Sequence, residues 1–155
     1  AQARKASELG VRVALVRTGV VLDRSGGALA RMLPFFRAGV GGPVAGGRQW
    51  IPWIHADDVA GLYLAALDGE GWEGPINATG PHPARNRDFS RALGRALSRP
   101  AIAPVPALAL RALYGDMARI VTANQRAIPT RATQLGYTFA HPDLDEALRH
   151  ALTSS

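Results

Sequence analysis

The chain contains no cysteine and only one lysine, Lys5. Without cysteine it can form no disulfide framework, no thiolate nucleophile and no cysteine-based metal site. No apolar run approaches the ~18–20 residues of a membrane-spanning helix, and the N-terminal residues show no secretory signal. We therefore expect a protein of a reducing cytoplasm that has no contact with a membrane.

The formal net charge is +6, and a basic domain is compatible with nucleic-acid binding. The bases are almost all arginine, however, and they are scattered along the chain. The most regular series has a spacing of four, which predicts a solvated helix face: Arg87, Arg91, Arg95 and Arg99. We expect no nucleic-acid partner. A hydrophobic fraction of 47% over 155 residues is sufficient for the core of an ordinary domain.

The first segments show the order of an α/β fold. Residues 2–9 predict the end of a helix that Gly10 stops, and residues 11–16 predict a strand. A nearly continuous apolar strand after a helix is typical of a parallel sheet covered by helices. Residues 28–36 then show helical spacing, and a glycine-rich loop follows at 39–47.

Helix and strand signals continue to the C-terminus. Residues 50–55 predict a short strand with an edge or bulge at Pro52, and either Asp57 or Asp58 is expected to cap the next helix. The remaining predicted elements are a strand at 76–78, a helix capped by Asn86 that ends before Pro100, and helices at 107–123, at 130–135 and from near Asp143.

Motifs for common chemistries are absent. Gly42 to Gly47 has the glycine spacing of a P-loop, but Arg48 and Gln49 follow where lysine and a hydroxyl residue are required. We interpret this segment as a loop at the mouth of a cleft. No strand-Gly-x-Gly-x-x-Gly-helix unit and no Gly-x-Ser-x-Gly elbow occurs, so we assign no catalytic residue.

The four histidines are His55, His82, His141 and His150, and none has a second ligand at metal spacing in the sequence. We expect no metal site. His55 is predicted to pack or to form a hydrogen bond within its strand, and His141, which precedes Pro142 in a turn, is predicted to be structural.

Trp50 and Trp53 flank Pro52 directly after the glycine-rich loop. Together with Arg48 they could line a pocket that stacks a ring and pairs an anion. The alternative is that both tryptophans belong to the core. We predict that Trp50 is the more exposed of the two.

Residues 48–60, Arg-Gln-Trp-Ile-Pro-Trp-Ile-His-Ala-Asp-Asp-Val-Ala, resemble a segment of extended short-chain dehydrogenase/reductases. The resemblance is to an NAD-dependent epimerase/dehydratase subgroup with an extra C-terminal segment of the DUF1731 type. It extends to residues 16–22 and 76–80, and to Gly115-Asp116-Met117 and Gly136-Tyr137 in the C-terminal part.

The resemblance implies an α/β fold, with the C-terminal part of a Rossmann-like parallel sheet of few strands and a mostly helical substrate-side subdomain. We expect residues 1–80 to form the sheet end with its loop and helix, and residues 81–155 the helical segment, within one compact unit. It implies cofactor contacts by Arg17, Thr18, Gly19 and Val20. It implies substrate contacts by Arg48, Gln49, Trp50, Trp53 and His55.

Two departures from the family pattern are informative. No tyrosine is followed by a lysine four positions later, so the usual Tyr-x-x-x-Lys pair is missing. Nucleotide-sugar epimerases have Arg-Asp-Phe where this chain has Ile51-Pro52-Trp53, which disfavours a nucleotide-sugar substrate. NAD or NADP is then expected to bind a longer parent of roughly 300 residues, and not tightly to this segment alone.

Two functions remain open at this stage. The chain is either the substrate-side half of an NAD(P)-dependent epimerase/dehydratase or oxidoreductase, inactive alone, or an autonomous non-catalytic module that binds a small anion or a protein. In the first case its partners are a small-molecule substrate and an N-terminal Rossmann half. Without that half, the apolar strand at 11–16 is expected to cause self-association.

Overall fold

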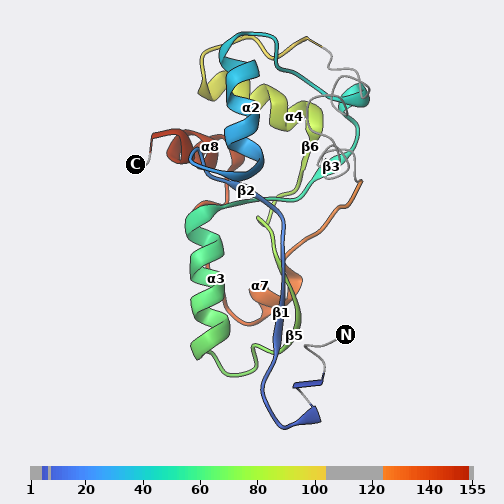
Figure 1. Ribbon diagram of the computed structural model, residues 1–155, viewed down its shortest axis with the longest axis vertical. Coiled ribbons are helices and arrows are strands. Elements are labelled where there is room, and N and C mark those ends of the chain that lie inside the picture. Colours follow the sequence, from blue (N-terminus) through green and yellow to red (C-terminus); the bar gives the residue numbers. More distant parts are fainter. Residues whose placement is uncertain (1–4, 7, 104–123, 154–155) are drawn as a thin grey trace.

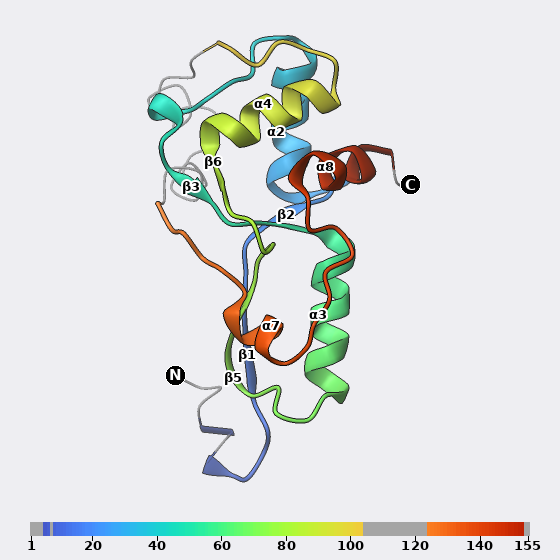
Figure 2. The same ribbon diagram turned by 180° about the vertical axis from the view of Figure 1, so that it is seen from behind.

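The computed structural model describes residues 5–6, 8–103 and 124–153. Half of the predicted helix at 2–9 and the whole of that at 107–123 lie outside these ranges. The described elements form an elongated molecule with strands β1 and β5 toward one end and helices α2, α4 and α8 toward the other (Figures 1 and 2). The α/β class predicted from the sequence is confirmed.

Strand β1 (Ala14–Thr18) pairs in parallel with β5 (Gly74–Ala78), with Ala14 opposite Gly74 and Thr18 opposite Ala78. The predicted bounds of 11–16 are therefore wrong at both ends. The strand begins at Ala14 because its partner β5 begins opposite this residue, at Gly74. Arg12 lies before the strand, and its guanidinium donates to the Ala66 carbonyl oxygen near the end of α3 (Ala56–Asp68) at 2.7 Å.

Gly19 connects β1 to β2 (Val20–Leu22), which pairs in parallel with β4 (Trp53–His55). The Gly19 N–H donates to the Ala78 carbonyl oxygen at 3.0 Å, and the Val20 N–H donates to the Pro52 carbonyl oxygen at 2.7 Å. A Cβ atom at Gly19 would lie 2.1 Å from that same Pro52 oxygen, so only glycine fits this crossing.

The predicted strand at 50–55 is divided at Pro52, as the sequence indicated. Strand β3 (Trp50–Ile51) pairs antiparallel with β6 (Ala84–Arg85), whereas β4 belongs to the parallel pair. Proline has no N–H group and cannot continue a ladder, so the chain changes partners at this residue.

Three helices lie toward the end of the molecule opposite β1 and β5: α2 (Gly27–Arg37), α4 (Asn86–Ala96) and α8 (Leu144–Thr153). Their inward residues recur at helical spacing, with Leu29, Phe89 and Leu148 fully buried. Asn86 does not cap α4 with its side chain, because Arg85 occupies the N-cap position. The Asn86 side chain is buried, and its Oδ1 accepts from the Val44 N–H beside η1 (Ala45–Gly47).

The buried residues form two clusters. One lies between α2, α4 and α8 and includes Trp53, and the other lies between β1, β5, α3 and α7 (Thr130–Gln134) and includes Ile76. Each cluster contains residues from both sides of position 80, and the predicted division at that position stays a prediction. Among the described residues, no helix combines the length and apolarity needed to cross a bilayer.

Candidate functional site

The carboxyl ends of β1 and β5 meet where Thr18 lies opposite Ala78. Arg17 and Thr18 are exposed there, while Gly19 and Val20 are half-buried. The next residue after β5, Thr79, is only 2% exposed, and its hydroxyl has no hydrogen-bond partner in the described part of the chain. Ligands of open α/β sheets bind outside the carboxyl ends of strands, so this edge has the position of a ligand site.

Two arginine side chains lie against the ring of Trp50, and these three residues are called the Trp50 group. The Arg85 guanidinium lies 3.9 Å from the centroid of the indole ring, and that of Arg126 lies 5.1 Å away. Arg85 also donates to the backbone carbonyl oxygen of Arg48, and Arg48 is itself exposed. Trp50 is partly exposed and Trp53 is buried, which confirms the predicted order of exposure.

Among the five residues predicted to contact substrate, Trp53 and Gln49 are buried and use their side chains in hydrogen bonds to the backbone. Trp53 is 1% exposed, and its Nε1–H donates to the His82 carbonyl oxygen at 2.9 Å. The Gln49 side chain is buried, and its Nε2 donates to the Val44 carbonyl oxygen at 3.0 Å. Trp50 in β3 is partly exposed and Trp53 in β4 is buried, so Trp50 is the one of the two that presents its ring at the surface. Sequence reasoning also missed Arg85 and Arg126, because only folding brings them to Trp50.

His55 lies apart from the Trp50 group, at the N-cap of α3. Its Nδ1 accepts from the Asp57 N–H at 3.1 Å. The prediction that Asp57 or Asp58 caps this helix is wrong, because both residues already lie in its first turn. A cap must come from the extended residue before that turn, and His55 has φ −73° and ψ 150°.

Asp58 instead anchors the chain segment that precedes α8. Its buried carboxylate accepts from the Ala140 N–H at 2.7 Å and from the His141 N–H at 3.1 Å. The Tyr137 hydroxyl lies 3.4 Å from the same carboxylate. Burial, together with the nearby Asp58 charge, raises the pKa of Tyr137 to about 12, so its phenol stays protonated and acts as a donor.

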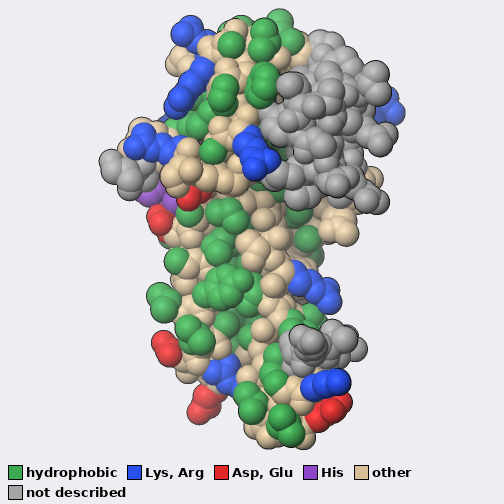
Figure 3. Space-filling view, in the orientation of Figure 1, with side chains coloured by type: hydrophobic (Ala, Val, Ile, Leu, Met, Phe, Trp, Pro, Cys, Tyr) green, Lys and Arg blue, Asp and Glu red, His purple; other side chains and the backbone are tan. Residues whose placement is uncertain are grey.

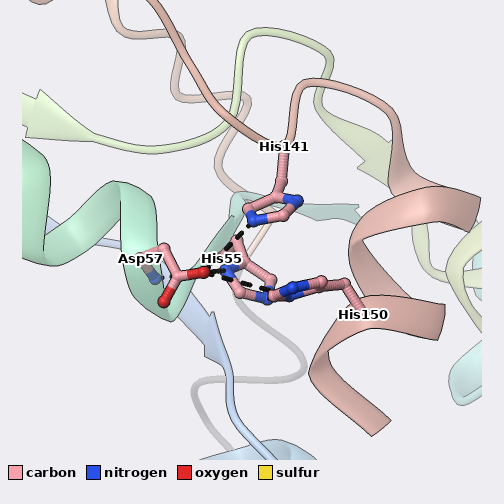
Figure 4. Close-up of side chains that lie close together, drawn as sticks. All are labelled: His55, Asp57, His141 and His150. Atoms are coloured by element: carbon pink, nitrogen blue, oxygen red, sulfur yellow. Dashed lines mark hydrogen bonds and ion pairs between the residues drawn. The ribbon is translucent and has the colours of Figure 1, made fainter. Parts of the chain in front are cut away.

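Three histidines and Asp57 converge beside this anchor (Figure 4). Asp57 Oδ2 lies 3.2 Å from His141 Nε2 and 3.4 Å from His55 Nδ1, and His150 Nδ1 lies 3.1 Å from His55 Nε2. On its other side, His141 Nδ1 lies 3.0 Å from a Glu146 carboxylate oxygen. The fold thus collects potential metal ligands that sequence spacing had separated.

The histidines in this cluster differ in their affinity for protons. Burial lowers the pKa of His55, and the positive charge of a protonated His141 lowers it further. Burial by itself also lowers the pKa of His141, but hydrogen bonds to Glu146 and Asp57 outweigh burial, so the pKa is raised. Of these two, His141 is therefore the ring that carries the proton more readily.

Comparison with known proteins identifies relatives along most of the chain. Residues 105–151 match the family described as "Domain of unknown function (DUF1731)". The chain is 48% identical over 139 residues to "Epimerase family protein SDR39U1 homolog, chloroplastic" of Arabidopsis thaliana, covering 90% of this chain and 40% of that protein. It is 41% identical over 151 residues to "Epimerase family protein Mb2239" of Mycobacterium bovis, covering 97% and 50% respectively.

Among solved structures, the chain is similar to human epimerase family protein SDR39U1 (isoform 2) with NADPH. The TM-score is 0.86 at 39% identity, over 92% of this chain and 49% of the human chain. The chain spans about half the length of the curated relatives it matches. One relative is named chloroplastic, so a cytoplasmic location stays a prediction.

These findings confirm the resemblance inferred from residues 48–60 and from the C-terminal part. The sequence similarity, the shared fold and the matched C-terminal segment agree with one another. The chain thus has the sequence and fold of the C-terminal half of an extended short-chain dehydrogenase/reductase-like epimerase, with the DUF1731 segment at residues 105–151.

Proposed function

We propose that this chain is the substrate-side half of an NAD(P)-dependent epimerase/dehydratase or oxidoreductase that acts on a small molecule. The carboxyl edge of β1 and β5 carries this proposal, because the buried Thr79 hydroxyl there has no partner among the described residues. An unpaired buried hydroxyl is costly unless a ligand or water satisfies it. The solved human relative contains NADPH, which supports a nicotinamide cofactor.

In this proposal Arg17, Thr18, Gly19 and Val20 face the nicotinamide end of NAD or NADP. The close approach of Gly19 to the Pro52 carbonyl oxygen fixes the backbone of this segment. The pyrophosphate site and the proton-transferring tyrosine belong to a Rossmann half, since the sequence has neither a dinucleotide fingerprint nor a Tyr-x-x-x-Lys pair. The chain alone is then inactive.

The Trp50 group is proposed to hold the substrate. The side chain of Arg48 is exposed, and two further guanidinium groups, those of Arg85 and Arg126, lie within 5.1 Å of the indole centroid. Guanidinium groups bind carboxylates and phosphates through paired hydrogen bonds, and an indole face stacks on planar groups. A substrate with an anionic group beside a flat or apolar part suits this surface.

The Rossmann half is proposed to cover β1 and α3. Within the described residues β1 pairs only through the edge that faces β5, which leaves its other edge available. Figure 3 shows hydrophobic side chains gathered on the lower part of the molecule. In α3, the side chains of Tyr63, Leu64 and Leu67 are 46%, 61% and 69% exposed. Without its partner the chain should self-associate. A monomer at ~100 µM in analytical ultracentrifugation contradicts this expectation.

Calorimetric titration with NADPH tests the main proposal. The 155-residue chain alone is expected to show no binding tighter than ~100 µM, and addition of a separately expressed Rossmann half from a relative is expected to restore it. Arg17→Ala should weaken binding by the reconstituted pair, whereas Arg37→Ala at the exposed end of α2 should not. Tight NADPH binding by the isolated chain overturns the proposal.

A second candidate function is a non-catalytic module that binds a small anion or a protein. The arginine group around Trp50 favours it, because that surface lies within the chain and needs no cofactor. This function is favoured over the first if the isolated chain binds pyrophosphate, if Arg85→Ala abolishes that binding and Arg91→Ala does not, and if the reconstituted pair does not bind NADPH. If the Trp50→Ala variant binds every tested ligand as tightly as the unaltered chain, the surface around Trp50 is not the binding site in either candidate function.

A further inference from the structure

The cluster of His55, Asp57, His141 and His150 has no role in the proposed reaction. Its members come from three separate segments: the junction of β4 and α3, the loop before α8, and α8 itself. One ligand atom from each residue can be chosen so that all four lie within 4.8 Å of one another. In the close-up view the four side chains point toward a common centre (Figure 4).

We propose that these four residues form a binding site for a divalent transition metal ion, with Zn²⁺ the best suited. Three imidazoles and one carboxylate are a donor set that zinc accepts. Zinc–ligand distances of about 2.0–2.1 Å place tetrahedral ligands about 3.3–3.5 Å apart. The Asp57 Oδ2 atom already lies 3.2 Å from His141 Nε2, 3.4 Å from His55 Nδ1 and 3.9 Å from His150 Nδ1.

Glu146 provides an independent indication. Its carboxylate oxygens lie 3.0 and 3.1 Å from His141 Nδ1, on the side of the ring opposite Asp57. Metal-binding histidines usually donate their second N–H to a carboxylate, which fixes the ring and the tautomer. Glu146 therefore holds His141 with Nε2 directed at the site, the orientation that a metal ligand needs.

Exposure and helix ends also suit an ion. The side chain of Asp57 is 60% exposed, which leaves a route for entry, whereas that of His55 is 3% exposed and forms the floor. His150 lies in the last turn of α8, where the helix dipole favours a cation. The dipole of α3 opposes a cation near its first turn, and the negative charge of Asp57 offsets that effect.

Binding releases one proton and breaks one hydrogen bond. With metal absent, His141 holds protons on both nitrogens when it donates to Asp57 and Glu146 together. The ion displaces the proton on Nε2, so this proton is released to solvent. His55 accepts from the Asp57 N–H through Nδ1, so its neutral ring carries a proton on Nε2. As the fourth ligand, His55 gives up this cap bond.

A bound ion would act as a clamp. It would join the start of α3 to the loop before α8 and to α8 itself, next to the anchor that Asp58 already forms with Ala140 and His141. Four protein ligands describe a closed site, which is typical of structural rather than catalytic zinc. The site lies within one chain, so its test needs neither a nicotinamide cofactor nor a Rossmann half.

The experiment uses the 155-residue chain, freed of metal with EDTA and dialysed, and titrated with ZnCl₂ in a calorimeter. We expect one Zn²⁺ per chain with a Kd of about 1 µM or tighter, and weaker binding at lower pH because protons compete. Co²⁺ should give the visible absorption of a tetrahedral complex. No binding of either ion, or a Co²⁺ spectrum of the octahedral aqueous type, overturns the proposal.

Variants locate the site. Asp57→Asn and His150→Ala should each weaken Zn²⁺ binding at least tenfold, and Glu146→Gln, which keeps all four ligands, by about 10–100-fold. The matched control is His82→Ala, since His82 is an exposed histidine outside the cluster. Equal affinity in Asp57→Asn, His82→Ala and the unaltered chain refutes the assignment. If a ligand variant fails to fold, Glu146→Gln and the Co²⁺ spectrum of the unaltered chain decide.

Discussion

The Asp58 anchor leads to a quantitative prediction for Asp58→Asn. The carboxylate is 1% exposed and accepts from two backbone N–H groups, those of Ala140 and His141. Hydrogen bonds to a charged acceptor contribute about 1.5–3 kcal/mol each. Asparagine keeps the shape but only one acceptor oxygen, so one bond is lost and an NH₂ group faces an N–H group.

We expect Asp58→Asn to lower the free energy of unfolding by about 2–4 kcal/mol. For a chain of this length that corresponds to a fall in Tm on the order of 10 °C. Urea unfolding followed by tryptophan fluorescence, in EDTA to remove bound metal, measures the change directly.

Two further variants separate the contributions to this anchor. Tyr137→Phe removes the hydroxyl near Asp58 but keeps the ring against Trp72 and Phe139, and should cost about 1 kcal/mol. Asp68→Asn, at the exposed end of the same helix, is the control and should change stability by less than about 0.5 kcal/mol. If Asp58→Asn unfolds at the same urea concentration as Asp68→Asn, the anchor does not stabilise the fold.

Three other predictions concern separate parts of the molecule. Gly19→Ala should lower the free energy of unfolding in urea by more than about 2 kcal/mol, because its Cβ would meet the carbonyl oxygen of residue 52. Gly26→Ser is the control and should be neutral or slightly stabilising, because there is free space around this N-cap position. Similar unfolding midpoints for the two variants contradict the requirement for glycine at position 19. In EDTA, His141→Gln should lower Tm more at about pH 5.5 than at about pH 8. The raised pKa of this histidine stabilises the fold below the unfolded value of about 6.5, and that contribution is lost as the pH rises through the folded value; an equal loss at both pH values is the contrary result. Arg95→Ala removes a bidentate contact with Asp145 between α4 and α8, but both side chains are well exposed, so the loss should stay below about 1 kcal/mol and shrink at high salt.

Local patterns in the sequence were sufficient for several elements. The spacing of apolar residues over 28–36 predicted the helix that the structure shows as α2, because a helix repeats every 3.6 residues whatever surrounds it. Pro52 predicted the break between β3 and β4 for an equally local reason, the missing N–H group. The greater exposure of Trp50 followed from its position beside the glycine-rich loop and the polar residues that precede it.

Only the tertiary structure decided strand limits and side-chain partners. β1 begins at Ala14 because β5 begins opposite it, and a single strand contains no record of its partner's ends. Aspartate is a common helix-capping residue, yet Asp58 accepts from the backbone N–H groups of residues 140 and 141, more than 80 positions away. His55 and His150 lie 95 positions apart in the sequence and 3.1 Å apart in the fold. Residue type and spacing determine which surfaces are buried, whereas the packing of distant segments determines which polar groups meet within them.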